Sequence, residues 1–376
     1  MSAAGDRIRG FDGLRALALV AVFLQHYTPL GRDYETGGYG VWLFFALSGF
    51  LIVRILVAER RRMEAGDTAW SAALGRFFWR RTLRIWPAYY LALGVFTVLA
   101  AVRLVDDFPL KDAWWHYAYL SNVYFGEVLG RWIGRFGHFW SLAVEEQFYL
   151  LAAPLLILAP SRWARGLCAA VVLASLSCNL AMRSSGATAM ALYTHPLINF
   201  GALAFGGWIG LGAPARPAGG SASWPALGCL GATVAFIVGF HHIGAMPEGA
   251  ALMVAAAPFL FATVAGGLAL LAVYLNQQSL VVRALEWGPI AYFGRVSYGF
   301  YLYHNLLPRW LVTRLAQGLG FDWRAPWWLE AGVSFALALG VAALSWAVLE
   351  KPILRLKDRV PRLPGWRSRK AAPAAA

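Results

Sequence analysis

About ten apolar stretches of roughly 20 residues follow one another along this chain, and they constrain its fold more than any other feature. A helix of about 20 residues crosses the roughly 30 Å hydrocarbon core of a bilayer. We therefore expect an all-α polytopic membrane protein with about ten transmembrane helices. The expected spans are residues 11–31, 38–58, 84–104, 138–159, 164–182, 192–213, 222–240, 250–275, 289–316 and 327–349.

Composition excludes an ordinary soluble domain. The chain is 59% hydrophobic and 14% charged, whereas soluble domains contain about 45–50% apolar residues. A net charge of +14 would suggest nucleic acid in a soluble protein, but in a membrane protein it indicates topology and contact with anionic lipid. We therefore expect membrane lipid and no nucleic acid as partners. Cys168, Cys178 and Cys229 are isolated within apolar segments, which predicts neither disulfides nor a metal site.

The distribution of basic residues predicts the orientation. With a cytoplasmic N-terminus, the cytoplasmic segments hold 22 Lys and Arg residues and the opposite side holds nine, leaving out Arg15 and Arg295 within spans. This bias places both termini in the cytoplasm. The apolar start resembles a signal peptide but contains Arg15 and lacks a cleavage pattern, so it should stay as the first span. We expect one domain over 1–352 and a disordered basic cytoplasmic tail over 353–376.

Ionisable residues within spans are functional hypotheses because they are costly in a bilayer. His26 lies roughly 22 Å along the first span, and Glu145 lies roughly 10 Å below the outer surface on an inward-running span, so the two share one depth. A carboxylate beside a histidine would orient the imidazole while it removes a proton from a hydroxyl. The alternative is a structural role for both. Glu146 points about 100° away from Glu145 on a helix, so only one can face His26.

An arginine cluster precedes the third span. Arg80, Arg81 and Arg84 occupy neighbouring helical positions, and guanidinium groups bind phosphate bidentately. The cluster suits an anionic ligand such as a nucleotide-bearing acyl carrier, or anchors the chain to acidic lipid. The segment from Trp70 to Trp86 interleaves aromatic residues with arginines and is expected to lie in the interface plane.

Other polar residues leave two interpretations open. His304 either contacts an acceptor or hydrogen-bonds another helix, and Ser48 lacks the surroundings of a nucleophile, which favours packing. Trp114, Trp115 and Trp132 could stack on sugars or belong to an interfacial aromatic belt. The histidines have no metal-ligand spacing, so no metal is expected.

Six blocks, taken in order, resemble the membrane acyltransferase-3 family of bacterial O-acetyltransferases, and the resemblance covers nearly the whole chain. The blocks are RIRGFDGLRALALVAVFLQH (7–26), GVWLFFALSGFLI (40–52), RRTLRIWPAYY (80–90), HFWSLAVEEQFYL (138–150), SYGFYLYH (297–304) and the closing EKP (350–352). The chain resembles the stand-alone type, because no hydrolase-like domain follows the last block.

The resemblance implies an activity and its residues. It implies an O-acyltransferase in the bacterial cytoplasmic (inner) membrane that moves an acyl, usually acetyl, group from cytoplasmic acyl-CoA to a carbohydrate-type acceptor. His26 and Glu145 then become the catalytic pair, with proton abstraction or a transient acyl-histidine both open. Glu146, Ser141 and His304 are supporting candidates. The residues expected at the donor are Arg15, Arg80, Arg81 and Arg84.

Two other classes remain from the residues alone. A transporter would use the same buried groups as a proton relay without consuming thioester, and an assembly subunit would be insensitive to substitution of His26. The sequence fixes neither the acceptor, the acyl length nor the oligomeric state.

Overall fold

The computed structural model describes residues 7–105, 108, 110–242 and 248–359, and in these ranges the protein is helical without a strand. This confirms the all-α membrane fold. The main helices are α1 (Phe11–Tyr27), α2 (Pro29–Asp33), α3 (Thr36–Glu64), α4 (Trp70–Ala101), α5 (Ala113–Tyr117), α6 (Ser121–Val123), α7 (Phe139–Leu158), α8 (Ala164–Ser184), α9 (Ala189–Thr194), α10 (Pro196–Gly212), α11 (Trp224–His242), α12 (Glu248–Leu275), α13 (Leu280–Leu285), α14 (Gly288–Arg295), α15 (Ser297–Tyr303), α16 (Leu311–Gly318), α17 (Trp327–Ser345) and α18 (Lys351–Leu354). Short 3-10 or π segments η1–η6 are Leu110–Asp112, Tyr124–Leu129, Gly134–Phe136, Ser161–Trp163, Trp346–Glu350 and Arg355–Asp358.

Seven helical segments in the described ranges are long and apolar enough to cross a membrane. They are Thr36–Glu64, Trp70–Ala101, Phe139–Leu158, Ser161–Ser184, Trp224–His242, Ala256–Leu275 and Trp327–Lys357. Helices α1 and α10 have 17 residues each, which is about 26 Å at 1.5 Å per residue and slightly less than the hydrocarbon core. Both pack against α3 in the interior of the bundle, so they are core helices.

Helix α3 is the central element of the bundle. It packs against α10, α1, α12 and α7, and small residues allow close approach at two of these contacts. A Cβ added at Gly49 would lie 1.7 Å from the carbonyl oxygen of Leu203 in α10, and one at Gly40 would lie 2.4 Å from that of Ala18 in α1. In membranes such small residues bring helix backbones together. The helices that line the site are therefore held at short separations.

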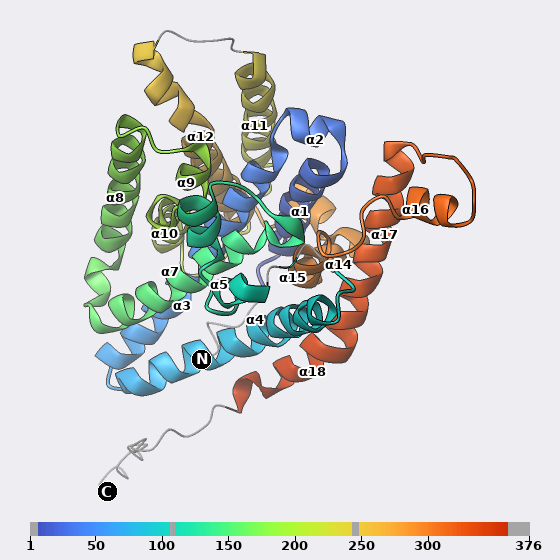
Figure 1. The fold of residues 1–376 in the computed structure, drawn as a ribbon. Helices are drawn as coiled ribbons and strands as arrows, with labels where there is room; N and C mark the ends of the chain where they lie inside the picture. Colours follow the sequence, from blue (N-terminus) through green and yellow to red (C-terminus); the bar gives the residue numbers. More distant parts are fainter. Residues whose placement is uncertain (1–6, 106–107, 109, 243–247, 360–376) are drawn as a thin grey trace, which may run out of the picture.

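Helix α4 is a single helix of 32 residues that continues through Pro87. The aromatic and arginine-rich segment from Trp70 to Trp86 is thus the first half of this helix and continues directly into the expected third span. In Figure 1 α4 runs across the lower part of the bundle, whereas α8 and α17 run along it.

The expectation of one helix over 289–316 is wrong. The chain forms α14, breaks at Val296, forms α15 and then leaves the helical conformation before α16. Pro308 cannot continue a hydrogen-bonded helix, and Trp310 has a positive φ of 58°. The breaks leave α15 as a short piece in the bundle interior, while Figure 1 shows α16 projecting beside α17.

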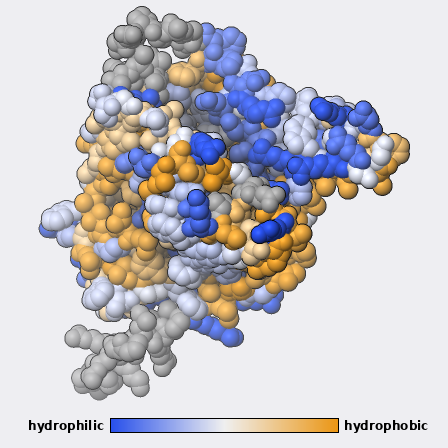
Figure 2. Space-filling view, in the orientation of Figure 1, coloured by the Kyte–Doolittle hydropathy of each residue, from blue (hydrophilic) through white to orange (hydrophobic). Residues whose placement is uncertain are grey.

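The surface agrees with a membrane location. Large apolar side chains are exposed on helices α8, α11 and α17, for example Leu173, Val234 and Leu344. In Figure 2 hydrophobic residues, in orange, cover much of the flanks of this face, and hydrophilic residues gather at its upper right. Lipid tails would cover such flanks. Cys168, Cys178 and Cys229 are all free.

Candidate active site

Two cavities lie one after the other inside the bundle. Four helices, α1, α3, α7 and α15, contribute residues to both cavities. Along α3, residues 37–42 line one cavity and residues 41–55 line the other. Helix α1 contributes Arg15 to one cavity and His26 to the other, about 16 Å apart at 1.5 Å per residue. We call the cavity that contains Arg15 the inner cavity and the one that contains His26 the outer cavity.

The inner cavity has a volume of about 260 Å³ and a strongly cationic lining. Arg15, Arg81, Arg84 and Glu145 line it, so cations outnumber anions. The apolar part of the lining comes mainly from α3: Val41, Phe44, Phe45, Leu47, Leu51, Ile52 and Ile55. A cavity lined by both guanidinium groups and aliphatic and aromatic groups suits an anionic ligand with an apolar arm.

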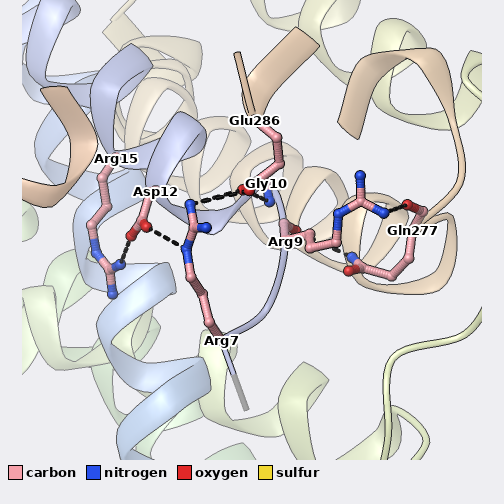
Figure 3. Close-up of polar contacts among 7 residues, drawn as sticks. All are labelled: Arg7, Arg9, Gly10, Asp12, Arg15, Gln277 and Glu286. Carbon is pink, nitrogen blue, oxygen red and sulfur yellow. Dashed lines mark hydrogen bonds and ion pairs between the residues drawn. The ribbon is translucent and has the colours of Figure 1, made fainter. Parts of the chain in front are cut away.

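Ionic contacts at the start of α1 hold Arg15 in place. Its Nη1 donates to Oδ1 of Asp12 at 3.0 Å, and Arg7 donates to Oδ2 of the same carboxylate at 2.9 Å. Arg7 also pairs with Glu286 at 3.1 Å, and Glu286 accepts from the backbone N–H of Gly10 at 2.7 Å. Figure 3 shows this chain of contacts, which ties the first turn of α1 to the segment before α14.

Aromatic and hydroxyl groups position the arginines of α4. The guanidinium of Arg81 lies 5.6 Å from the ring centroid of Tyr149, whose hydroxyl is 2.6 Å from Oγ of Ser48. Arg80, which the sequence also predicted at the donor, is exposed and does not line the inner cavity. The structure thus brings three of the four predicted arginines together.

The outer cavity is larger, about 910 Å³, and mixes aromatic with ionisable groups. Its charged lining includes Asp33, Glu35 and Arg309 beside His26. Its aromatic lining includes Tyr34, Tyr39, Trp42, Trp132, Trp140, Tyr193, Phe240 and Tyr301. Aromatic faces with nearby carboxylates and histidines can hold a polyhydroxylated molecule by stacking and hydrogen bonding. Of the three tryptophans that the sequence singled out, only Trp132 lines this cavity, whereas Trp114 stacks on Trp115 with centroids 4.0 Å apart.

Three histidines form a row at the outer cavity. The ring centroids of His26 and His304 are 5.2 Å apart, and those of His304 and His138 are 5.0 Å apart. Nδ1 of His304 lies 2.7 Å from the carbonyl oxygen of Tyr301 and must donate, because a carbonyl only accepts. Neutral His304 therefore carries its lone pair on Nε2, which has no hydrogen-bond partner among the described residues. Sequence reasoning missed His138, although it stands three residues before Ser141.

The predicted pair of His26 and Glu145 does not form. His26 lines the outer cavity and Glu145 the inner one, and they share no hydrogen bond among the described contacts. The structure places the two residues at different depths: His138, at the start of α7, is next to His26 through His304, and Glu145 lies seven residues, about 10 Å, further along α7 at the inner cavity. Glu146 lines neither cavity: it is buried, and Nε1 of Trp86 donates to it at 3.5 Å. The catalytic roles of these residues stay predictions.

Two residues, Val41 and Tyr301, line both cavities. The hydroxyl of Tyr301 is 2.5 Å from Oγ of Ser141, so one of these hydroxyls donates to the other. The backbone carbonyl of His138, 3.2 Å from the Tyr301 hydroxyl and 3.1 Å from Oγ of Ser141, accepts from whichever hydroxyl still has its proton free. We call Val41 and Tyr301 the septum. Tyr301 lies in the SYGFYLYH block three residues before His304, and that helical spacing is the signal that could have pointed to it. Within the described residues no group of three His, Cys, Asp or Glu side chains is placed to hold a metal ion.

Comparisons with known proteins identify the family. O-acetyltransferase OatA of Staphylococcus aureus (strain NCTC 8325 / PS 47) is 34% identical over 151 residues, which are 38% of this chain and 23% of that protein. Peptidoglycan O-acetyltransferase OatA of Listeria monocytogenes is 33% identical over 168 residues, 42% of this chain and 25% of that protein. The match thus spans about a quarter of each relative. No solved structure matches significantly. The family model described as an acyltransferase domain matches residues 8–347, and the chain belongs to that acyltransferase family.

Proposed function

We propose that this protein is an O-acetyltransferase of the bacterial cytoplasmic membrane, which moves an acyl group from acyl-CoA to a hydroxyl of a carbohydrate-type acceptor. The observation that carries the proposal is the pair of cavities in series, one cationic and one lined by histidine and aromatic side chains. The relatives are named as O-acetyltransferases, and one as acting on peptidoglycan.

In this proposal the donor occupies the inner cavity from the cytoplasm. Arg15, Arg81 and Arg84 bind phosphate groups of the coenzyme, and the apolar lining from α3 receives the pantetheine arm. The thioester carbonyl reaches the septum. An acceptor hydroxyl approaches the same septum through the outer cavity, where the exposed ring of Trp132 offers a stacking face.

The chemical step uses His26 as a general base. Its neutral imidazole accepts the proton of the acceptor hydroxyl while that oxygen attacks the thioester carbonyl. The C–S bond then breaks, the new C–O ester bond remains, and the proton returns from the imidazolium to the departing thiolate. The ring of His304, which is beside His26 and hydrogen-bonded to a backbone carbonyl, restricts where the His26 ring can lie.

Release of free coenzyme A, followed by thiol titration, tests the proposal. Membranes with the wild-type protein or His26→Ala receive acetyl-CoA, with or without an envelope glycan extract. We expect glycan-dependent release by the wild type and a loss of about 10² to 10⁴-fold in His26→Ala, the range for a general base. His242→Ala is the matched control, because His242 is exposed and lines neither cavity. Full activity of His26→Ala would overturn the assignment.

The donor site has its own test in neighbouring arginines of one helix. Arg81→Gln should raise the KM for acetyl-CoA about tenfold or more, because a charge-assisted phosphate contact contributes roughly 1.5–3 kcal/mol. Arg80→Gln should leave KM within about twofold, because a solvent-exposed charge contributes little. Equal effects of the two substitutions would show that the coenzyme binds along the exposed face of α4 instead.

A further inference from the structure

We infer that Tyr301 is the barrier between the two sides of the membrane: its side chain, with that of Val41, closes the path between the donor and acceptor cavities and positions the thioester against it. The inference rests on the proposed function for the identity of the two ligands, but the barrier itself can be measured without any acyl transfer.

Val41 and Tyr301 are the residues at which the two cavities meet. Val41 is the only residue of α3, and Tyr301 the only residue of α15, that lines both cavities, and these ranges lie wholly within the described chain. Every other lining residue of α3 and α15 contributes to one cavity alone: Trp42 lines the outer cavity, and Ser48 and Tyr298 line the inner one. A separation made by two residues is about one side chain thick.

The contacts of Tyr301 hold its side chain in place. Its side chain is 7% exposed, and its hydroxyl is anchored to Oγ of Ser141 and to the carbonyl oxygen of His138. The ring also packs edge-on against Phe44, with centroids 6.1 Å apart, and against His138 at 5.5 Å. Hydrogen bonds at the far end of the ring and aromatic contacts along it fix one position. A side chain held in this way stays in one rotamer, which keeps the path between the cavities closed while these contacts last.

The barrier has a chemical purpose. Water in the outer cavity must not reach the thioester, since it would hydrolyse it, so the septum has to be closed while that cavity is filled with water. When an acceptor displaces this water, the Tyr301 ring has to turn aside so that the acceptor hydroxyl reaches the carbonyl carbon. A phenol ring closes the gap by bulk and leaves a polar edge, the hydroxyl pair of Tyr301 and Ser141, where the acyl carbonyl ends. The septum thus positions the thioester and limits the space beyond its carbonyl carbon.

Sided thiol labelling tests the barrier. Cys168, Cys178 and Cys229 are first replaced by Ala, and Ser48→Cys places one thiol in the inner cavity. A charged, membrane-impermeant methanethiosulfonate is then added to sealed vesicles from one side at a time. With Tyr301 intact we expect labelling only from the side where α3 ends and α4 begins. Equal labelling from both sides would overturn the inference.

Substitutions at the septum should change the sidedness of this labelling. Tyr301→Ala should raise labelling from the opposite side by about tenfold or more, because loss of an aromatic side chain leaves a void far larger than a water molecule. Tyr301→Phe keeps the ring and should keep the barrier. Tyr298→Ala is the matched control, since Tyr298 lies on the same helix and lines the inner cavity alone. Unchanged sidedness in Tyr301→Ala would refute the barrier.

Two further measurements keep the outcomes distinct. Labelling of every variant from the α3–α4 side reports that the bundle is folded. If the Tyr301→Ala protein does not insert into the membrane, Val41→Ala tests the same barrier by opening the septum from α3. Acceptor-independent release of coenzyme A should rise in Tyr301→Ala as water reaches the thioester. Sided labelling without any release would leave the barrier in place and refute the proposed function.

Discussion

The contact between α3 and α10 allows a quantitative prediction for Gly49→Ala. A Cβ at this position would lie 1.7 Å from the carbonyl oxygen of Leu203, whereas real Cβ atoms essentially never come closer than 3.0 Å. The helices must therefore separate by at least about 1.3 Å at this point, because a backbone carbonyl cannot rotate away as a side chain does.

The separation has two measurable effects. Overpacking costs about 1–3 kcal/mol, against which the helix propensity gained by Gly→Ala is at most about 1 kcal/mol. Gly49 stands next to Ser48, which lines the inner cavity, so the shift also displaces the cavity wall. Misplacement of about 1 Å can cost a hundredfold in rate, and we expect acyl transfer to fall about 10 to 100-fold.

The assay compares Gly49→Ala with Gly340→Ala. Gly340 lies within the transmembrane helix α17, and an added Cβ there would meet no atom within 4 Å apart from its chain neighbours and the adjacent backbone of its own helix. Thermal unfolding in detergent and coenzyme A release are measured on both. We expect a lower Tm and lower activity for Gly49→Ala only. If the two variants unfold and react alike, the close approach of α3 and α10 does not determine the cavity geometry.

Two other predictions concern single ionisable groups. Glu145→Gln should lower kcat about a hundredfold if this carboxylate takes part in proton transfer. Glu146→Gln is the control, because Glu146 is packed outside both cavities. A lower KM at unchanged kcat would instead mean that Glu145 only balances the charge of the arginines. His116, in the segment between α4 and α7, is fully buried among aromatic rings, and this burial lowers its pKa to about 4. Because the unfolded chain binds the proton more tightly, stability should fall as the pH falls from about 6.5 to 4, by up to about 3 kcal/mol, and stay constant above that window. Thermal unfolding of wild type and His116→Phe at several pH values checks this, and an equal pH dependence in both would contradict it.

Helical rise predicted positions along one helix better than it predicted the relative depths of residues on two helices. Spacing along one span placed Arg15 and His26 at different depths, and the structure puts them in different cavities. Rise also gave His26 and Glu145 a shared depth, but in the structure His138 lies at the level of His26 and Glu145 lies about 10 Å further along α7. Rise along a single helix does not fix how far a neighbouring helix is shifted relative to it.

The break in the expected span over 289–316 arises from local backbone features that the apolar pattern does not show. Apolar residues alone suggested one span over 289–316, but Pro308 and the left-handed Trp310 end the helical run. The resulting short helix carries Tyr301 and His304 to the centre of the bundle. The sequence identified the SYGFYLYH block, which contains both residues. It did not show that Tyr301 lies between the two cavities whereas His304 lies beside His26.

The thinness of the septum has an electrical consequence. Suppose that the acyl group crosses outward as a formal cation while the coenzyme A thiolate takes its proton from the cytoplasm. Each turnover then moves one positive charge outward, against a membrane potential that is negative inside. That work is about 2.3 kcal/mol per 100 mV, and if water fills both cavities, nearly all of it is done across the ring of Tyr301. Return of the acceptor's own proton to the thiolate makes the exchange electroneutral. A proton path past Tyr301 would therefore make turnover independent of the membrane potential.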